Sequence, residues 1–482
     1  MWVRRRSGML LAICGLLASA CVDDAAPREE HESSDEPSAE MSDADGAAQT
    51  EDDADAGDVI DASADGGGRI KPDDAGARLF DPTRVAEMRF EVGDDGLAQL
   101  RADADERMGF EDFTYVAAKL TYDGTVYGEV ALRVKGNNSR TTAKGDAVPF
   151  KVDMNEYVDG QELDGQTKIN LHNNGNQAHG MSDYLSYAAF READVAASRT
   201  GWADVYLNGQ KLGLYTVVEQ VDDAMLARWY EQPEGALYKP EPQSGFLAYA
   251  GDSFDDYPTA SYEANDEDTD HATFLRVVKT VDEEPVSAWD AVIDVESVLQ
   301  YLAGNVALGN WDTYVSMGHN YYLFEATPGR MVMLPWDMNL SQASGGAVCA
   351  SELRMGGGMP GGFGGTRPTP PSDVGGGFPG GGAFPGGGGG PTGGRSAPLY
   401  DGLMQDPTTF ARYLEVLGAF LAGPGSADAL LANLAIAQHA VGDRITTSAI
   451  EALRTTIRTR VATLEAAIPS TTMCAASGSA QP

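Results

Sequence analysis

Basic residues are scarce in this sequence. Its 482 residues include 34 Lys and Arg against 73 Asp and Glu, and the formal net charge is −39. Nucleic acids and anionic membrane surfaces are both bound through clusters of positive charge. The composition therefore argues against either of them as a partner of the protein.

Apolar runs long enough to cross a bilayer are also lacking. The run Met9–Ala20 follows three arginines and is shorter than the ~20 residues that a membrane helix needs. It is followed by Cys21, and the small residues just before this cysteine are typical of signal-peptidase cleavage. We expect residues 1–21 to be a signal peptide with a lipobox and Cys21 to be lipidated. The alternative is an ordinary signal peptide that ends beside a cysteine.

Cysteine is rare as well, with four residues in the chain. Cys14 lies within the predicted signal peptide, and Cys21 would carry the lipid. Cys349 and Cys474 remain, and such a pair in an exported protein favours a disulfide. Two unpaired thiols are the alternative.

Large apolar residues are almost absent from residues 22–80, which contain 19 acidic and 4 basic residues. Such a segment cannot bury enough apolar surface to offset the entropy lost on ordering. We expect a disordered, self-repelling linker that holds the folded part away from a membrane. The protein is then an exported, membrane-anchored lipoprotein of the bacterial cell envelope, in the periplasm or at the cell surface.

From residue 81 onwards the pattern indicates an α+β fold. Alternating apolar residues predict strands, for example in the hairpin 202–221, and helical spacing follows Ser182, a candidate helix cap. We expect the main domain to span 81–345. Residues 355–396 are rich in Gly and Pro, which predicts a flexible insertion. Residues 397–470 predict two or three further helices.

Three polar residues surround one predicted hairpin. Asp312 lies in a short loop after a helix, Asn320 begins the first strand and Asp337 follows the second. Because a hairpin brings its two ends together, Asn320 and Asp337 should be close, with Asp312 facing them. His319 is expected to be a structural hydrogen-bonding residue.

The same order of residues occurs in protein kinases. There one Asp positions the attacking hydroxyl, and an Asn and a later Asp hold magnesium against the phosphates. Magnesium is a hard cation that prefers carboxylate and amide oxygens. The spacing differs, because eight residues separate Asp312 from Asn320 where a kinase loop has about five. Capping or turn residues of an ordinary hairpin are the alternative.

Six short segments add to this set. They are KGNNSR at 135–140, PFKVDM at 149–154, LNGQKLGLYTVVEQV at 207–221, NWD at 310–312, HNYYL at 319–323 and PWD at 335–337. Each is weak by itself. Together, in this order over roughly residues 130–345, they resemble the spore coat protein H (CotH) kinase family, a group of atypical protein kinases.

The resemblance implies an atypical, two-lobed kinase-like fold that uses ATP with Mg²⁺ or Mn²⁺. It implies that Asp312 is the catalytic residue and that Asp337 and Asn320 bind the metal. Lys151 is the candidate for the lysine that contacts the phosphates. A surface lysine is the alternative, because other lysines are near it in the sequence.

Further residues acquire expected roles from the same resemblance. Gly136 and Ser139 belong to a glycine loop whose backbone N–H groups are expected to meet phosphates. Arg133 and Arg140 would either neutralise phosphate charge or pair with acidic neighbours. Glu219 ends a strand as a kinase hinge does, so its backbone would meet adenine unless it is only a strand end.

The sequence departs from the family at three positions. Lys135 replaces the first arginine of the glycine loop, which keeps the charge but loses the planar fork. Ser182 stands where an arginine is expected, and Asn339 where many members have a second Asp. Asp183 lies where a kinase places the acid that pairs with its lysine; an exposed helix acid is the alternative.

Together these observations predict an atypical protein kinase. It would transfer the ATP γ-phosphate to a Ser or Thr of an exported or surface protein, acting as a monomer. A non-catalytic, surface-anchored binding or structural lipoprotein with the same fold is the alternative, since ATP is scarce outside the cytoplasm.

Overall fold

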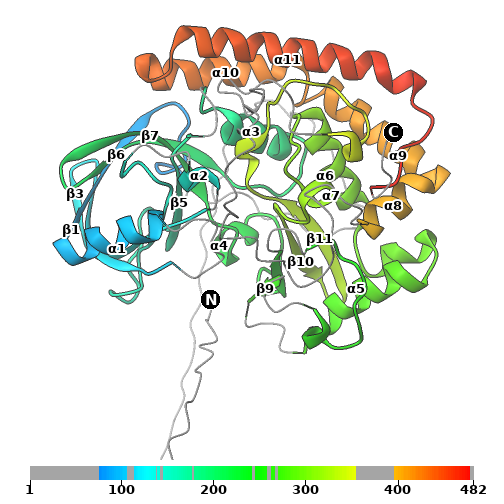
Figure 1. The fold of residues 1–482 in the computed structure, drawn as a ribbon, viewed down its shortest axis with the longest axis horizontal. Coiled ribbons are helices and arrows are strands. Elements are labelled where there is room, and N and C mark those ends of the chain that lie inside the picture. Colours follow the sequence, from blue (N-terminus) through cyan, green and yellow to red (C-terminus); the bar gives the residue numbers. More distant parts are fainter. Residues whose placement is uncertain are drawn as a thin grey trace, which may run out of the picture. The chain divides into compact units, whose positions relative to one another are not determined.

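Seven strands of the N-terminal half close into a barrel in the computed structural model (Figure 1). Their order around the barrel is β1-β2-β3-β4-β5-β7-β6. β1 and β6 pair in parallel and close the sheet, whereas the other neighbours pair antiparallel. The strands are β1 (Val85–Val92), β2 (Val116–Tyr122), β3 (Thr125–Val134), β4 (Phe150–Asp153), β5 (Lys168–His172), β6 (Thr200–Leu207) and β7 (Gln210–Glu219).

The structure describes residues 75–105, 113–136, 138–141, 145–175, 179–240, 245–257, 262–265, 270–353 and 396–477. These residues all belong to one compact unit. The predicted signal peptide with Cys21, almost all of the predicted linker and nearly all of the Gly/Pro-rich segment lie outside them.

Along the strands, buried apolar residues alternate with residues on the outer face of the barrel wall. In β3, Val130, Leu132 and Val134 are fully buried in the barrel core. Arg133 lies between two of them, in register with Lys151 of β4. Because successive strand residues point to opposite faces, both basic side chains are on the outer face of the wall.

A second sheet contains four strands in the order β11-β10-β8-β9. They are β8 (Leu237–Pro240), β9 (Tyr262–Ala264), β10 (Tyr321–Thr327) and β11 (Arg330–Pro335). The hairpin predicted around Asn320 and Asp337 is confirmed, because Tyr321 pairs with Pro335 at its open end. Just beyond this pair, the Trp336 N–H donates to the Asn320 carbonyl over 3.3 Å.

Eleven α-helices are found in the described residues. They are α1 (Asp94–Asp105), α2 (Asn138–Thr141), α3 (Ser182–Glu192), α4 (Asp223–Leu226), α5 (Ala272–Glu283), α6 (Val295–Ala307), α7 (Tyr314–Met317), α8 (Pro398–Gln405), α9 (Pro407–Ala422), α10 (Ala427–Val441) and α11 (Thr447–Ala467). Six short 3-10 helices join them: η1 (Phe254–Asp256), η2 (Val286–Ala291), η3 (Met338–Leu340), η4 (Ala350–Glu352), η5 (Gly442–Arg444) and η6 (Ile468–Ser470).

The C-terminal region has four α-helices where two or three were expected. The extra break is at Asp406, whose carboxylate accepts hydrogen bonds from the backbone N–H groups of Thr408 and Thr409. Pro407 then starts α9, since proline needs no hydrogen-bonded N–H in the first helical turn. By itself, no described helix is long and apolar enough to cross a membrane, although α9 and Ala427–Arg444 together pass that test as a bent pair.

Ser182 is not the cap of α3, contrary to the prediction. The N-cap residue is Met181, and no side chain caps the helix. Ser182 instead starts the helix, and its hydroxyl donates to the Ser341 carbonyl over 3.0 Å. The serine therefore joins α3 to the segment that follows η3.

The α+β class is confirmed, but a clear two-lobed kinase layout is not seen. The parallel pairing of β1 with β6 closes the N-terminal sheet into a barrel. Cys349 and Cys474 form a disulfide across a sequence separation of 125 residues. This bond ties the C-terminal tail to the start of η4.

Candidate active site

A pocket lies where the ends of β3 and β5 meet the beginning of α3 and the end of β11. Its lining includes Lys135, Gly136, Ser139, His172, Asp183 and Asp337. These residues lie at or near the ends of separate elements, which together position one set of polar side chains.

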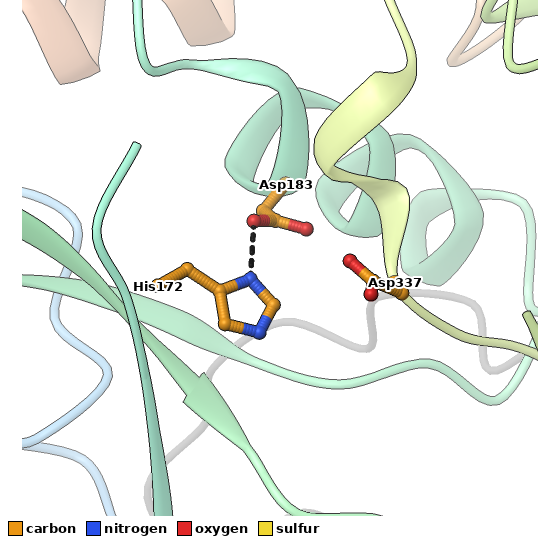
Figure 2. A group of neighbouring side chains, drawn as sticks. All are labelled: His172, Asp183 and Asp337. Carbon is orange, nitrogen blue, oxygen red and sulfur yellow. Dashed lines mark hydrogen bonds and ion pairs between the residues drawn. The ribbon is translucent and has the colours of Figure 1, made fainter. Parts of the chain in front are cut away.

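Three of these side chains form a tight cluster (Figure 2). One possible ligand atom from each of His172, Asp183 and Asp337 lies within 4.8 Å of the other two. The His172 Nδ1 and Asp183 Oδ2 atoms are 2.7 Å apart and hydrogen-bonded. Figure 2 shows the other Asp183 oxygen directed toward the Asp337 carboxylate.

Each of the two carboxylates has an oxygen without a partner. Asp183 Oδ1 and Asp337 Oδ1 are buried and accept no hydrogen bond from any residue that the structure describes. Burying an unpaired carboxylate is costly, and two that face each other also repel. The pair therefore suits a cation between the two oxygens.

The backbone at this place is unusual. Asn320 and Asp337 have φ angles of +62° and +49°, in the left-handed region that residues other than glycine rarely adopt. Such conformations cost free energy and are frequent at functional sites. Both residues stand at the open end of the β10–β11 hairpin.

Lys135 supplies positive charge to the pocket. Its Nζ lies 2.9 Å from His172 Nε2 and 5.5 Å from the centre of the Trp336 ring. Because a protonated Lys135 donates to Nε2, the ring proton of His172 is on Nδ1 and is donated to Asp183. Burial lowers the pKa of Lys135 to about 8, although the charges of Asp337 and Asp183 act in the opposite direction.

Asp312 and Asn320 are joined directly. The Asn320 amide donates to the Asp312 carbonyl over 2.8 Å, and Asp312 Oδ1 is 2.7 Å from His319 Nε2. His319 therefore has the structural hydrogen-bonding role that was predicted. The Asp312 carboxylate is 15% exposed and remains partly open to solvent.

The three residues predicted from the hairpin are brought together. Asn320 bonds to Asp312 through its side chain and to Trp336, the neighbour of Asp337, through its carbonyl. Burial raises the pKa of Asp337, and the nearby charges of Asp183 and Asp312 raise it further, against the effect of His172 and Lys135. The Asp337 carboxylate also clusters with His172 and Asp183.

The glycine loop borders the same pocket. Gly136 has a φ of +75°, and a Cβ on it would lie only 2.5 Å from Ser139 Oγ. Arg140 is 3% exposed; its guanidinium donates to the carbonyls of Gly136 and Asp103 over 2.5 and 2.7 Å. These two contacts hold the loop, and the choice between phosphate neutralisation and pairing with an acidic neighbour stays a prediction for Arg140.

Lys151 does not line the pocket. In register it lies between Arg133 and Asn170 on the outer face of the barrel wall. Arg133 donates to the Val134 carbonyl over 3.1 Å and lies 5.2 Å from the centre of the Tyr115 ring. The lysine found beside the carboxylates is Lys135.

Glu219 ends β7 within a buried ion network, and the hinge role of its backbone stays a prediction beside the strand-end alternative. Its side chain is fully buried and pairs with Arg199 over 2.7 Å and with Arg228. Its backbone N–H already donates to the Arg199 carbonyl. This buried ion network joins the end of β7 to β6 and α4.

Sequence reasoning missed His172 and Lys135. The sequence analysis gave His172 no role and treated Lys135 only as a departure from a loop motif. The available signal was positional: His172 ends β5, and Lys135 comes just after β3. Asp183 was expected either to pair with a kinase-type lysine or to be an exposed helix acid. It is buried and bonds to His172, so the exposed alternative is wrong and the pairing with a lysine stays a prediction.

Two comparisons with known proteins identify relatives of this chain. The family model described as CotH kinase protein matches residues 132–430. The inner spore coat protein H of Bacillus subtilis (strain 168) is 25% identical over 166 residues, which cover 33% of this chain and 45% of that protein. The chain thus aligns with less than half of that relative's length. The resemblance seen in the short motifs is confirmed: the chain belongs to the CotH kinase protein family.

Proposed function

We propose that the protein is an atypical protein kinase, which transfers the γ-phosphoryl group of ATP to a Ser or Thr hydroxyl of a protein. One observation carries the proposal: the unpartnered oxygens of Asp183 and Asp337 lie beside Lys135 and near Asp312. Membership in the CotH kinase family supports the same chemistry.

The residues present suit a divalent cation. Asp337 and Asp183 would hold it through the two oxygens that otherwise remain unpaired, and the oxygens are the hard ligands that Mg²⁺ and Mn²⁺ prefer. His172 would orient the Asp183 carboxylate instead of binding the cation, because its two ring nitrogens already contact Asp183 and Lys135. When bound, the cation would offset the negative charge of the ATP phosphates. Asn320 is a further oxygen ligand in this proposal.

The protein's own side chains then divide the remaining tasks. Lys135 is placed to donate hydrogen bonds to the phosphates from the pocket wall, and Gly136 leaves the loop backbone open to close approach. Asp312 accepts the proton of the attacking hydroxyl, held in orientation by His319. The new oxygen–phosphorus bond forms as the bond between the γ-phosphorus and the bridging oxygen breaks, and ADP leaves.

The substrate and setting are proposed by analogy. The relative's name places it in the spore coat, and the sequence begins with a predicted lipoprotein signal. We expect a monomeric enzyme that is anchored through lipidated Cys21 and acts on an exported or surface protein. No nucleic acid is expected as a partner, because the chain carries a net charge of −39.

Nucleotide binding tests the proposal against a non-catalytic module. ATP with Mn²⁺ or Mg²⁺ is expected to raise the melting temperature, since a ligand at 100 times its Kd stabilises by about 2.7 kcal/mol. ATP with EDTA should give a much smaller shift, because both carboxylates then face the phosphates. Radioactive ATP should label co-expressed exported proteins. Absence of both a metal-dependent shift and labelling would favour the non-catalytic lipoprotein.

Two lysines can be compared directly. Lys135→Met is expected to raise the KM for ATP by roughly ten- to a hundredfold, because a charge-assisted hydrogen bond contributes about 1.5–3 kcal/mol. Lys151→Met, on the outer barrel face, should change it by less than about threefold. Initial rates over a range of ATP concentrations measure both. A larger effect at Lys151 would restore the assignment made from the sequence.

A further inference from the structure

Arg460 is a buried charge that the proposed reaction does not use. It lies on α11 and is 1% exposed. Its guanidinium donates to the carbonyls of Ala307 and Ala343 over 2.8 and 3.3 Å and to Gln342 Oε1 over 2.6 Å. No carboxylate pairs with it within the described ranges.

Such a group is expensive to bury. The cost of taking a guanidinium out of water is not returned by an opposite charge, and burial lowers the pKa of Arg460 to about 10. An apolar side chain of similar volume would often serve stability as well or better. Stability alone therefore does not explain a buried arginine at this position. The residues that accept its hydrogen bonds indicate its role.

The acceptors belong to the two segments that carry the proposed active-site carboxylates. Ala307 ends α6, which leads directly to Asp312. Gln342 and Ala343 follow η3, which starts right after Asp337. The two segments are also joined by the Gln342 N–H, which donates to the Leu308 carbonyl over 2.7 Å. Arg460 thus links the segment that precedes Asp312 to the segment that follows Asp337.

The contacts continue from Gln342 to α3. The Gln342 amide nitrogen donates to Ser186 Oγ over 3.3 Å, and Ser186 Oγ is 2.6 Å from Ser341 Oγ. Ser341 is bonded in turn to Ser182, the residue before Asp183. All four of these polar residues are buried. A chain of hydrogen bonds therefore runs from α11 to the turn of α3 that carries Asp183.

Two further contacts join the C-terminal helical region to β6 and to α3. Arg444 of η5 makes a bidentate ion pair with Asp204 of β6, and Asn433 of α10 donates to Glu192 at the end of α3. Figure 1 shows α10 and α11 along one edge of the molecule, beside α3. The family match ends at residue 430, so α11 lies beyond it.

We propose that α11 is a built-in brace, in which Arg460 acts as a positioning residue for Asp183, Asp312 and Asp337. The brace holds α3 in the position that brings Asp183 to Asp337 without a separate activating protein. Its catalytic consequence rests on the proposed kinase function, whereas the positioning of α3 does not. Arg460, Gln342 and Ser186 do not line the active-site pocket, whereas Ser182 does.

The test uses Arg460→Met, with Arg458→Met as the matched control, because Arg458 is an exposed arginine on the same helix. Hydrogen–deuterium exchange of the backbone over residues 182–187 is measured in the full chain. We expect exchange about tenfold faster in Arg460→Met and unchanged in the control. Labelling from radioactive ATP should show kcat reduced about tenfold, with little change in the KM for ATP. Arg460→Lys should recover part of both effects.

The outcomes separate the two proposals. Equal exchange over residues 182–187 in Arg460→Met and Arg458→Met overturns the brace, whatever the activity. If the wild-type protein transfers no phosphate but Arg460→Met still exchanges faster than Arg458→Met, the brace is supported and the kinase function is not. If Arg460→Met does not fold, Ser186→Ala cuts the same chain of contacts more mildly, and unchanged exchange in that variant overturns the brace.

Discussion

Asp312→Asn is expected to abolish phosphoryl transfer while the protein still binds ATP with its metal. The amide has the same shape as the carboxylate and can keep the contact with His319, but it cannot accept the proton of the attacking hydroxyl. General bases contribute about 10²- to 10⁴-fold to rate, so kcat should fall by that factor. Single-turnover labelling with radioactive ATP measures the loss, and the metal-dependent thermal shift should remain.

The control is Asp282→Asn, an exposed acid on α5 away from the pocket. It should label at the wild-type rate and melt at the wild-type temperature. Retention of more than about a tenth of the wild-type kcat in Asp312→Asn would remove Asp312 from the role of proton acceptor. Loss of the thermal shift as well would instead indicate that Asp312 binds the metal.

Asp337→Asn is expected to have the second large effect. Removing one of the two facing carboxylates should weaken binding of the divalent cation and lower kcat on the order of 10³-fold, because a metal contributes several kcal/mol to stabilising transition-state charge. Titration of Mn²⁺ followed by thermal shift, and labelling at saturating ATP, measure the two effects. Wild-type affinity for Mn²⁺ in this variant would place the cation elsewhere.

The same substitution has a pH signature in the metal-free protein. Burial raises the pKa of Asp337 in the folded state above its value in the unfolded chain. The folded state therefore binds this proton more tightly, and the unfolding free energy rises as pH falls through the folded-state pKa. Asp337→Asn should thus be more stable than the wild type at neutral pH, with the difference vanishing at acid pH. Adding Mn²⁺ should reverse the order at neutral pH.

Local sequence rules suffice for several parts of the molecule. The hairpin that joins Asn320 to Asp337 needs only two alternating strands and a short turn, so its ends had to meet whatever the rest of the fold does. The Asp312 side chain follows at a short distance along the chain and reaches His319 within one loop. The α+β class rests on patterns of the same local kind.

Contacts between segments that are far apart in the sequence could not be predicted from local patterns. His172 and Asp183 meet Asp337 across more than 150 residues, and nothing in the local pattern favours Lys135 over Lys151 for the same pocket. The choice depends on which end of β3 and β4 lies beside α3, because Lys135 follows the end of β3 whereas Lys151 lies within β4. The closure of the barrel by β1 and β6 also could not be predicted, because parallel strands are not joined by a short turn with a sequence signal.

Two charged residues show why local patterns do not fix the surroundings of a side chain. Glu219 and Arg140 were assigned from motif position, but each is buried and must find partners, which the fold supplies from Arg199, Arg228 and backbone carbonyls. The role of a buried charged group depends on the groups around it, and only the tertiary structure shows which groups these are. The sequence by itself determined the acidic character, the element types and the hairpin site, since these follow from composition and short-range periodicity. Tertiary structure alone decided the barrel, the two facing carboxylates and the reach of Arg460 beneath them, because these depend on which distant segments exclude water from one another.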